Sequence, residues 1–299
     1  TGTTALLVNK QLKILSSCNI EYKQHYPKPG WVEHDLDDIW ASTIKAIRTA
    51  VRKAKVSTKQ ISAIGIANQR ETVCFWSKKT GKPLCRAIVW QDRRTTDFCN
   101  ELKKSGVESD VAYKTGLVID PYFSASKIRW AIDNIPAVQQ ALSKNDLQVG
   151  TIDSFLVSRL THNEVHATET SNASRTMLFS LDSLSWDDEL LKLFKIPEHI
   201  LPEVKKSVDK FGVNKKVPGL SDGIPICGIL GDQQSALMGQ ACLEPGTAKC
   251  TYGTGSFILM NTGTQIRRSS FKQLTTVAWT IGGTTQYALE GAAFTAGAA

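Results

Sequence analysis

The chain has 299 residues, of which 41% are hydrophobic and 21% charged, and this ordinary globular composition and length suggest about two domains. The formal net charge of +8 suits anionic partners, but the Lys and Arg residues are dispersed, which argues against nucleic-acid binding. Seven cysteines without a C-x-x-C pair favour reduced thiols in an intracellular, cytoplasmic protein. No apolar run is long enough to predict a transmembrane helix.

Strands and helices are both predicted in the first half of the chain. Apolar runs at residues 5–8 and 12–16 predict a β-hairpin. Asp35 or Asp37 can cap a helix whose apolar face is formed by Trp40, Ile44, Ile47 and Val51. Further strands are predicted at residues 61–67, 72–76 and 87–90, and helices around 94–104, 124–134 and 153–160.

A second set of strands begins at residues 224–230 and breaks at a polar turn that leads into a short helix at 235–240. Four more strands are predicted at residues 247–251, 257–261, 275–280 and 286–290. Because strands are followed by helices in both halves, the sequence predicts a protein of the α/β class.

Two small, hydroxyl-rich turns can hold phosphate groups. Gly2-Thr3-Thr4 precedes the first apolar strand, and Tyr252-Gly-Thr-Gly-Ser256 separates two later ones. Backbone N–H groups and hydroxyls can bind phosphate oxygens there, and glycine lets the backbone approach without a Cβ clash. Taken alone, each segment is explained as well by an ordinary β-turn.

Asp232 is the candidate general base. It follows an apolar strand and precedes a helix, so its carboxylate is expected in the crevice where open α/β folds bind ligands. A carboxylate in that place can accept a proton from an attacking hydroxyl. The same pattern also fits a helix N-cap, and the sequence does not decide between the two.

Other residues offer contacts to a small polar ligand. Arg70 and Glu71 end a buried strand and together provide the donors and acceptors that a polyol needs, unless they form a surface salt bridge. Tyr122 can present a hydroxyl and Trp90 an aromatic platform, although lone aromatics are more often core residues. The five histidines have no metal-ligand spacing, and neither a P-loop nor a complete G-x-G-x-x-G motif is present. We therefore expect no protein-held metal and no NAD site.

The ordered set of motifs resembles the FGGY carbohydrate kinases, and specifically their glycerol-phosphorylating members. The matching stretches occupy residues 26–35, 68–72, 115–124, 150–154, 170–179, 231–234, 251–255 and 287–291. The resemblance extends over essentially the whole chain, and the order and spacing of the motifs make it specific. It implies an actin/hexokinase-like fold with two ribonuclease-H-like domains and a cleft between them.

The resemblance also assigns domains and roles. It implies a polyol-binding domain at residues 1–241, complete except for its first strand, and the truncated start of a nucleotide-binding domain at 242–299. Asp232 would act as general base on glycerol. Glycerol would be bound by Arg70, Glu71, Tyr122 and Asp232, assisted by Gln233, with Trp90 and Phe257 as the apolar wall. ATP phosphates would meet Gly2, Thr3, Thr4, Thr254 and Gly255, Gly297 would lie on the nucleotide side, and Mg²⁺ would carry the charge of ATP.

The sequence departs from the family pattern at its start. The family carries an Asp two residues before the first glycine, and this chain begins one residue too late to include it. We therefore expect an N-terminal fragment that binds ATP poorly and catalyses little. Two other functions stay open: another FGGY kinase acting on a pentulose or a similar polyol, or a non-catalytic scaffold or sensor. The sequence is also compatible with a homo-oligomer.

Overall fold

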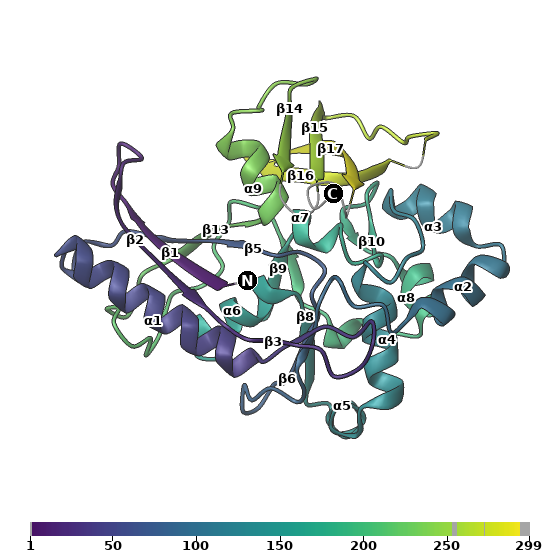
Figure 1. Ribbon diagram of the computed structural model, residues 1–299, viewed down its shortest axis with the longest axis horizontal. Helices are drawn as coiled ribbons and strands as arrows, with labels where there is room; N and C mark the ends of the chain where they lie inside the picture. Colours follow the sequence, from purple (N-terminus) through teal and green to yellow (C-terminus); the bar gives the residue numbers. More distant parts are fainter. Residues whose placement is uncertain (1, 253–255, 272, 294–299) are drawn as a thin grey trace.

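Figure 1 shows the computed structural model, which describes residues 2–252, 256–271 and 273–293. At one end, β1 (Gly2–Val8) pairs antiparallel with β2 (Ile14–Glu21), and helix α1 (Leu36–Ala54) packs along this hairpin. Asp35 caps α1 as predicted, because its side chain accepts hydrogen bonds from the first backbone N–H groups of the helix. Among the described residues, no helix is both long and apolar enough to cross a membrane.

The buried face of α1 is rotated from the predicted one. Leu36, Ile39, Ala46 and Ala50 are buried, whereas the predicted stripe that contains Trp40 and Ile44 is only half-buried. Ala46 and Ala50 belong to the buried face, and hydrophobic periodicity alone underweights such small residues.

Gly2, Thr3 and Thr4 do not form the predicted turn. They are the first residues of β1, where they lie opposite Glu21, Ile20 and Asn19 of β2. The two strands approach so closely that a Cβ atom on Gly2 would lie 2.9 Å from the carbonyl oxygen of Ile20. The expected phosphate-binding turn is therefore corrected to a strand, because antiparallel pairing with β2 extends the hairpin to its first described residue.

Most helices of the first 240 residues gather on the side of the molecule opposite α1 (Figure 1). The helices after α1 are α2 (Thr96–Lys104), α3 (Glu108–Thr115), α4 (Ser124–Asn134), α5 (Pro136–Ser143), α6 (Ile152–Leu160), α7 (Thr170–Ala173) and α8 (Asp188–Phe194), with 3₁₀ turns at Thr58–Gln60 and Glu198–Ile200. Among these helices, the predicted ones correspond to α2, α4 and α6, whereas the short helices α3, α5, α7 and α8 were not predicted.

Short strands lie between these helices along the chain and form small sheets. Their strands are β3 (Gln24–His25), β4 (Glu33–His34), β5 (Ile64–Asn68), β6 (Cys74–Ser77), β7 (Ala87–Ile88), β8 (Leu147–Gly150), β9 (Ala167–Glu169), β10 (Phe179–Ser180), β11 (Ser185–Trp186), β12 (Glu203–Lys205) and β13 (Ile226–Gly231). β5 pairs in parallel with β13, and β6 pairs antiparallel with β8. The largest apolar core lies between β6, β8 and the surrounding helices, and it includes the fully buried Phe75, Phe123 and Phe194. Burying each such side chain contributes about 1.5–3 kcal/mol.

A four-stranded antiparallel sheet, here called the second sheet, packs over the first part of the chain through α9 and α7 (Figure 1). Helix α9 (Asp232–Gly239) leads into strands β14 (Ala248–Tyr252), β15 (Ser256–Gly263), β16 (Leu274–Ile281) and β17 (Thr284–Ala293), in the order β14-β15-β17-β16. Hydroxyl pairs join β16 to α7 and the residue that follows it: Thr170 Oγ1 lies 2.9 Å from Thr280 Oγ1, and Ser174 Oγ lies 2.8 Å from Thr276 Oγ1. This junction places side chains of β17 against the ends of β5 and β13.

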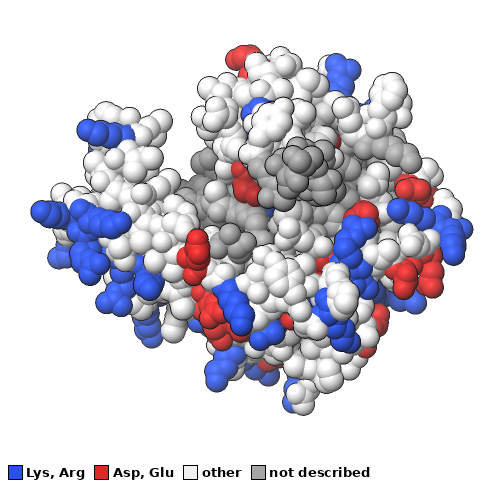
Figure 2. Space-filling view, viewed as in Figure 1, with Lys and Arg blue, Asp and Glu red and all other residues white. Residues whose placement is uncertain are grey.

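Basic side chains are less evenly spread than the sequence suggested. Figure 2 shows Lys and Arg gathered at the end of the molecule formed by α1 and the β1–β2 hairpin. The last turn of α1 carries Arg52 and Lys53, which interact favourably with the negative end of the helix dipole. Lys53 also donates to the carbonyl oxygen of Ser17 on β2, at 3.2 Å, so part of this charge serves to hold the helix on the hairpin.

Candidate active site

The two parallel strands β5 and β13 end at the same edge, and the candidate residues emerge there. Asn68 lies opposite Gly231 in the register, so the segments that follow each strand are neighbours. Arg70 Nε consequently lies 3.5 Å from Asp232 Oδ1 and 3.6 Å from Glu71 Oε1. The structure brings together the arginine, the glutamate and the aspartate on which the predicted site depends. Arg70 and Glu71 are only 2% exposed, so they do not form a surface salt bridge.

Glu71 is held in an unusual backbone conformation. Its φ angle is +60°, and the Thr72 N–H donates to the carbonyl oxygen of Arg70 across it, at 2.7 Å. This is the pattern of a γ-turn with positive φ, which is rare and strained. Ser124 Oγ at the start of α4 also donates to the carbonyl oxygen of Glu71. Strain of this kind is characteristic of functional sites, where the surroundings fix a side chain in a required direction.

Four buried charges form a closed ring beneath the site. Glu290 on β17 accepts from both terminal nitrogens of Arg70, at 2.6 and 2.9 Å, which is a bidentate pair. The same carboxylate accepts from Arg175 Nη2 at 3.0 Å. Arg175 Nε in turn donates to Glu71 Oε1 at 2.6 Å, and Glu71 lies beside Arg70. Two positive and two negative charges therefore alternate around the ring.

The two carboxylates of the ring differ in protonation behaviour. Burial alone would raise the pKa of Glu290, but Arg175 and Arg70 outweigh burial and lower the pKa to about 2. Burial raises the pKa of Glu71, although Arg70 and Arg175 oppose the shift. The difference follows from the contacts, because Glu290 accepts three N–H bonds from the arginines and Glu71 accepts one.

The residues above the ring are more exposed and include the aromatic candidates. Asp232 has 47% of its side chain exposed, and Trp90 and Phe257 are half-buried. The Trp90 ring makes edge contacts with Tyr122 at 5.7 Å and with Phe257 at 6.3 Å between centroids. Arg70 Nη2 reaches the Tyr122 hydroxyl at 3.4 Å. The arrangement is a charged floor with an aromatic wall and one accessible carboxylate.

Asp232 is the first residue of α9, and Gly231 occupies the N-cap position. The alternative that Asp232 is the helix N-cap is therefore not what the structure has. The side chain accepts from the Gln233 N–H at 2.7 Å. An accessible carboxylate in this place is suited to accept a proton.

Lys249 on β14 controls the orientation of Gln233. The residue is 5% exposed, and its ammonium group donates to Gln233 Oε1, to Thr251 Oγ1 at 2.8 Å and to the carbonyl oxygen of Phe257 at 3.4 Å. Because the Gln233 carbonyl oxygen is occupied by Lys249, its amide nitrogen remains as the donor for a ligand. Burial lowers the pKa of Lys249, with Glu290 as the largest opposing influence.

Gly231 allows the close approach of Arg70 to the end of β13. A Cβ atom at this position would lie 2.8 Å from both Cγ and Cδ of Arg70 and 2.8 Å from Gln234 Oε1. These side-chain atoms lie in the middle of the arginine, so they cannot move without displacing the guanidinium. Glycine is therefore required here for space, which the sequence pattern alone did not indicate.

Tyr122 is fixed by the loop that carries it. Asp120 Oδ1 accepts from the Tyr122 N–H at 2.8 Å. Lys127 on α4 is fully buried and donates to the carbonyl oxygens of Pro121, Tyr122 and Phe123 at 2.6, 2.6 and 3.1 Å. The aromatic wall is thus built on a rigid turn rather than on a mobile loop.

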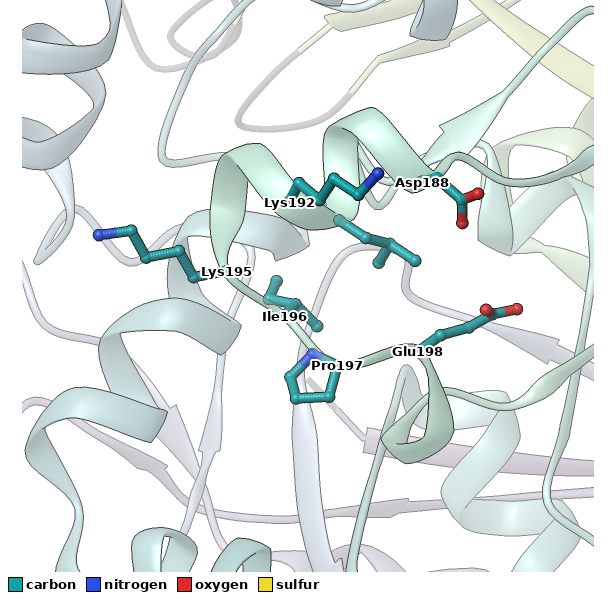
Figure 3. Close-up of a pocket in the computed structure, with 7 residues that line it drawn as sticks. Asp188, Lys192, Lys195, Ile196, Pro197 and Glu198 are labelled. Atoms are coloured by element: carbon teal, nitrogen blue, oxygen red, sulfur yellow. The ribbon is translucent and has the colours of Figure 1, made fainter.

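A surface hollow with a volume of about 340 Å³ lies beside α8 and does not include the candidate residues (Figure 3). It is lined by Asp188, Leu191, Lys192, Lys195, Ile196, Pro197 and Glu198, none of which belongs to the ring of four buried charges. Lys195 extends away from the other side chains in Figure 3. The residues that line the hollow include no candidate catalytic or substrate-binding residue, so we place the candidate active site at the ends of β5 and β13.

Three predicted nucleotide contacts, Thr254, Gly255 and Gly297, lie outside the described residues. Gly2, Thr3 and Thr4 are described: Thr3 Oγ1 lies 2.9 Å from Ser42 Oγ, and Thr4 Oγ1 accepts from Asn19 at 2.8 Å. These residues begin a strand rather than a turn, and their contacts with phosphate stay a prediction. Within the described ranges, no three His, Cys, Asp or Glu side chains come together in a metal-binding group.

Two members of the ring, Arg175 and Glu290, had no predicted role. Arg175 follows α7 in a stretch of small polar residues, and Glu290 lies 220 residues from its partner Arg70. A single acidic residue in the middle of an apolar strand was the available signal for Glu290, because such a charge requires a partner if it is buried.

Residues 1–239 match the model of the FGGY family of carbohydrate kinases, N-terminal domain. The match covers more than half of the 299 residues, and the chain belongs to this family. The fold is the actin/hexokinase-like fold of that family, as predicted.

Curated proteins that are similar to this chain are named glycerol kinase. The glycerol kinases of Myxococcus xanthus and Oceanobacillus iheyensis are 50% and 48% identical to it, over 301 and 299 residues. Both alignments cover all of this chain but only 61% and 60% of the relative, so the chain spans about three fifths of their length.

Solved structures of carbohydrate kinases have a fold similar to that of this chain. Plasmodium falciparum glycerol kinase with ADP has a TM-score of 0.92 at 38% identity, covering 97% of this chain and 58% of that one. Gluconate kinase from Lactobacillus acidophilus has a TM-score of 0.86 at 21% identity, with coverages of 98% and 58%, a likeness that concerns the fold alone.

Proposed function

We propose that the full-length protein containing this chain phosphorylates glycerol to glycerol 3-phosphate with ATP, and that Asp232 is the general base. The observation that carries the proposal is the location of the accessible Asp232 carboxylate 3.5 Å from Arg70, which is in turn beside Glu71. Relatives at about 50% identity that are named glycerol kinase support the choice of reaction.

The residues of the chain divide the work as follows. Glu71 accepts hydrogen bonds from polyol hydroxyls, and Arg70 and the Gln233 amide nitrogen donate hydrogen bonds to them. Asp232 accepts the proton of the attacking hydroxyl as its oxygen bonds to phosphorus and the bond to the ADP oxygen breaks. Trp90 and Phe257 cover the carbon chain and exclude water, which would otherwise compete as the acceptor.

The charges favour a neutral polyol over a sugar acid. Both buried arginines are already paired, Arg70 with Glu290 and Arg175 with Glu71 and Glu290. Neither is available to compensate a carboxylate on the substrate, and Asp232 would repel one. An acid of the gluconate type would therefore lose binding energy in this site, because a buried charge without a partner is costly.

ATP with bound Mg²⁺ supplies the phosphoryl group, and the ADP in the Plasmodium falciparum structure supports a nucleotide for this chain as well. Gly2, Thr3 and Thr4 begin a strand here, so their contacts with the phosphates stay a prediction. A nucleotide-binding domain beginning near residue 242, an intracellular location and a homo-oligomer belong to the same proposal.

A coupled ADP-release assay on the full-length protein tests the proposal. Glycerol, xylulose and gluconate are compared at equal concentration, with a no-acceptor control for ATP hydrolysis. Turnover with glycerol that exceeds turnover with the other two supports the proposal. Turnover with xylulose or gluconate and none with glycerol would assign another FGGY kinase, and no turnover with any of them would favour a non-catalytic protein.

A further inference from the structure

We propose that Glu290 and Arg175 are positioning residues that aim Arg70 and Glu71 at the polyol, an inference that rests on the proposed function. Neither residue is expected to touch substrate, because both side chains are fully buried beneath the site. They act through the two residues that are proposed to bind it.

Glu290 determines which edge of Arg70 faces the site. Its carboxylate takes both terminal nitrogens of the guanidinium, so the fork of Arg70 is directed toward β17. The remaining Nε edge then faces Asp232 and Glu71, at 3.5 and 3.6 Å. A bidentate pair fixes the plane of a guanidinium as well as its position, which a single hydrogen bond does not do.

Arg175 performs the equivalent task for Glu71. Its Nε–H donates to Glu71 Oε1 at 2.6 Å, which leaves the other carboxylate oxygen of Glu71 for a ligand. Its Nη2 bonds Glu290 at 3.0 Å, so the two positioning residues also hold each other. The guanidinium lies 5.4 Å from the Tyr122 ring centroid and 5.1 Å from that of Phe123, beneath the aromatic wall.

The ring joins the second sheet to the polyol site. Arg70, Glu71 and Arg175 belong to the first 240 residues, whereas Glu290 comes from β17 of the later sheet. Any displacement of β17 relative to β5 therefore moves Arg70. The geometry of the polyol site depends in this way on a residue that lies outside the segment matched by the N-terminal family model.

The first test is Glu290→Gln in the full-length protein. Glutamine has nearly the same shape but replaces one carboxylate oxygen with an NH₂ group, which must face an arginine donor. We expect the KM for glycerol to rise roughly 10- to 100-fold, since a small misplacement of binding groups has effects of that size. The KM for ATP should stay within about twofold, because ATP does not use this ring.

A matched control separates positioning from general stability. Thr280 is also buried at the junction with the second sheet, and its hydroxyl contacts Thr170 and Thr285, at 2.9 and 3.0 Å. The T280V variant removes these contacts without touching the ring, so it should lower the melting temperature and leave the KM for glycerol unchanged. If E290Q does not fold, R175K keeps all four charges of the ring and loses only the fork geometry, and it should show the same selective increase.

The outcomes are distinguishable from failure of the proposed function. Wild-type protein without glycerol turnover contradicts the proposed function, and a crystal structure of E290Q then tests the positioning directly. Arg70 should leave its place beside Asp232 in that structure and keep it in T280V. A folded E290Q or R175K protein with an unchanged KM for glycerol, or an unmoved Arg70, would overturn the inference.

Discussion

Replacing Arg175 with methionine should destabilise the protein far more than the loss of a surface ion pair. Arg175 is fully buried and bonds Glu71 at 2.6 Å and Glu290 at 3.0 Å. Without it, Glu290 keeps its bidentate pair with Arg70, but Glu71 retains only Arg70 Nε at 3.6 Å. A buried charge that loses its partner costs about 3–5 kcal/mol.

That cost is a large part of the roughly 5–15 kcal/mol that stabilises a typical domain. Urea unfolding followed by circular dichroism measures it from the shift of the midpoint. Arg129→Met is the matched control, because Arg129 pairs with the half-exposed Asp133 one helical turn away. The control should change stability by less than about 1 kcal/mol.

The pH dependence identifies Glu71 as the group responsible. Burial already raises its pKa, and loss of Arg175 raises it further. A carboxyl group whose folded pKa is raised binds its proton more tightly in the folded state, so its contribution to stability falls as pH rises through that pKa. The decrease in the free energy of unfolding caused by R175M should therefore be smaller at about pH 5 than at about pH 8. Equal midpoint shifts for R175M and R129M would refute the reasoning.

Two further predictions concern the same site. Gly231→Ala places a Cβ atom 2.8 Å from Cγ and Cδ of Arg70, so it should raise the KM for glycerol at least about tenfold; an unchanged KM would mean that the arginine has room to adjust. Acid should remove the contribution of Glu290, whose pKa falls from 4.5 to about 2 on folding. This group stabilises the folded state above pH 4.5 by about 3 kcal/mol, and the contribution is lost as pH falls toward 2. Melting temperatures between about pH 6 and pH 3 should fall less steeply for Glu290→Gln than for the wild type, and parallel profiles would contradict the assignment.

The parts of the fold that sequence reasoning recovered have strong local signals. Asp35 caps α1, and the apolar runs before Asn68 and Asp232 became the parallel strands β5 and β13. From those strand ends, the meeting of Arg70 with Asp232 could be expected, because parallel strands place their carboxyl ends at one edge.

The parts that it missed depend on distant contacts. Gly2, Thr3 and Thr4 look like a turn in sequence, but pairing with β2 makes them a strand. Arg175 and Glu290 lie 104 and 220 residues from Glu71 and Arg70, and nothing in their local sequence names these partners. Only the tertiary structure reveals that Arg70 and Glu71, the pair proposed to bind substrate, are themselves held by a second pair.

The most direct measurement of the central proposal is Asp232→Asn in the full-length protein, because asparagine keeps the shape of the side chain but cannot accept the proton. We predict that kcat with glycerol falls by roughly 10²- to 10⁴-fold while the Kd for glycerol, measured by calorimetry, changes little. A D232N protein that keeps its kcat would contradict the role of this carboxylate as the general base.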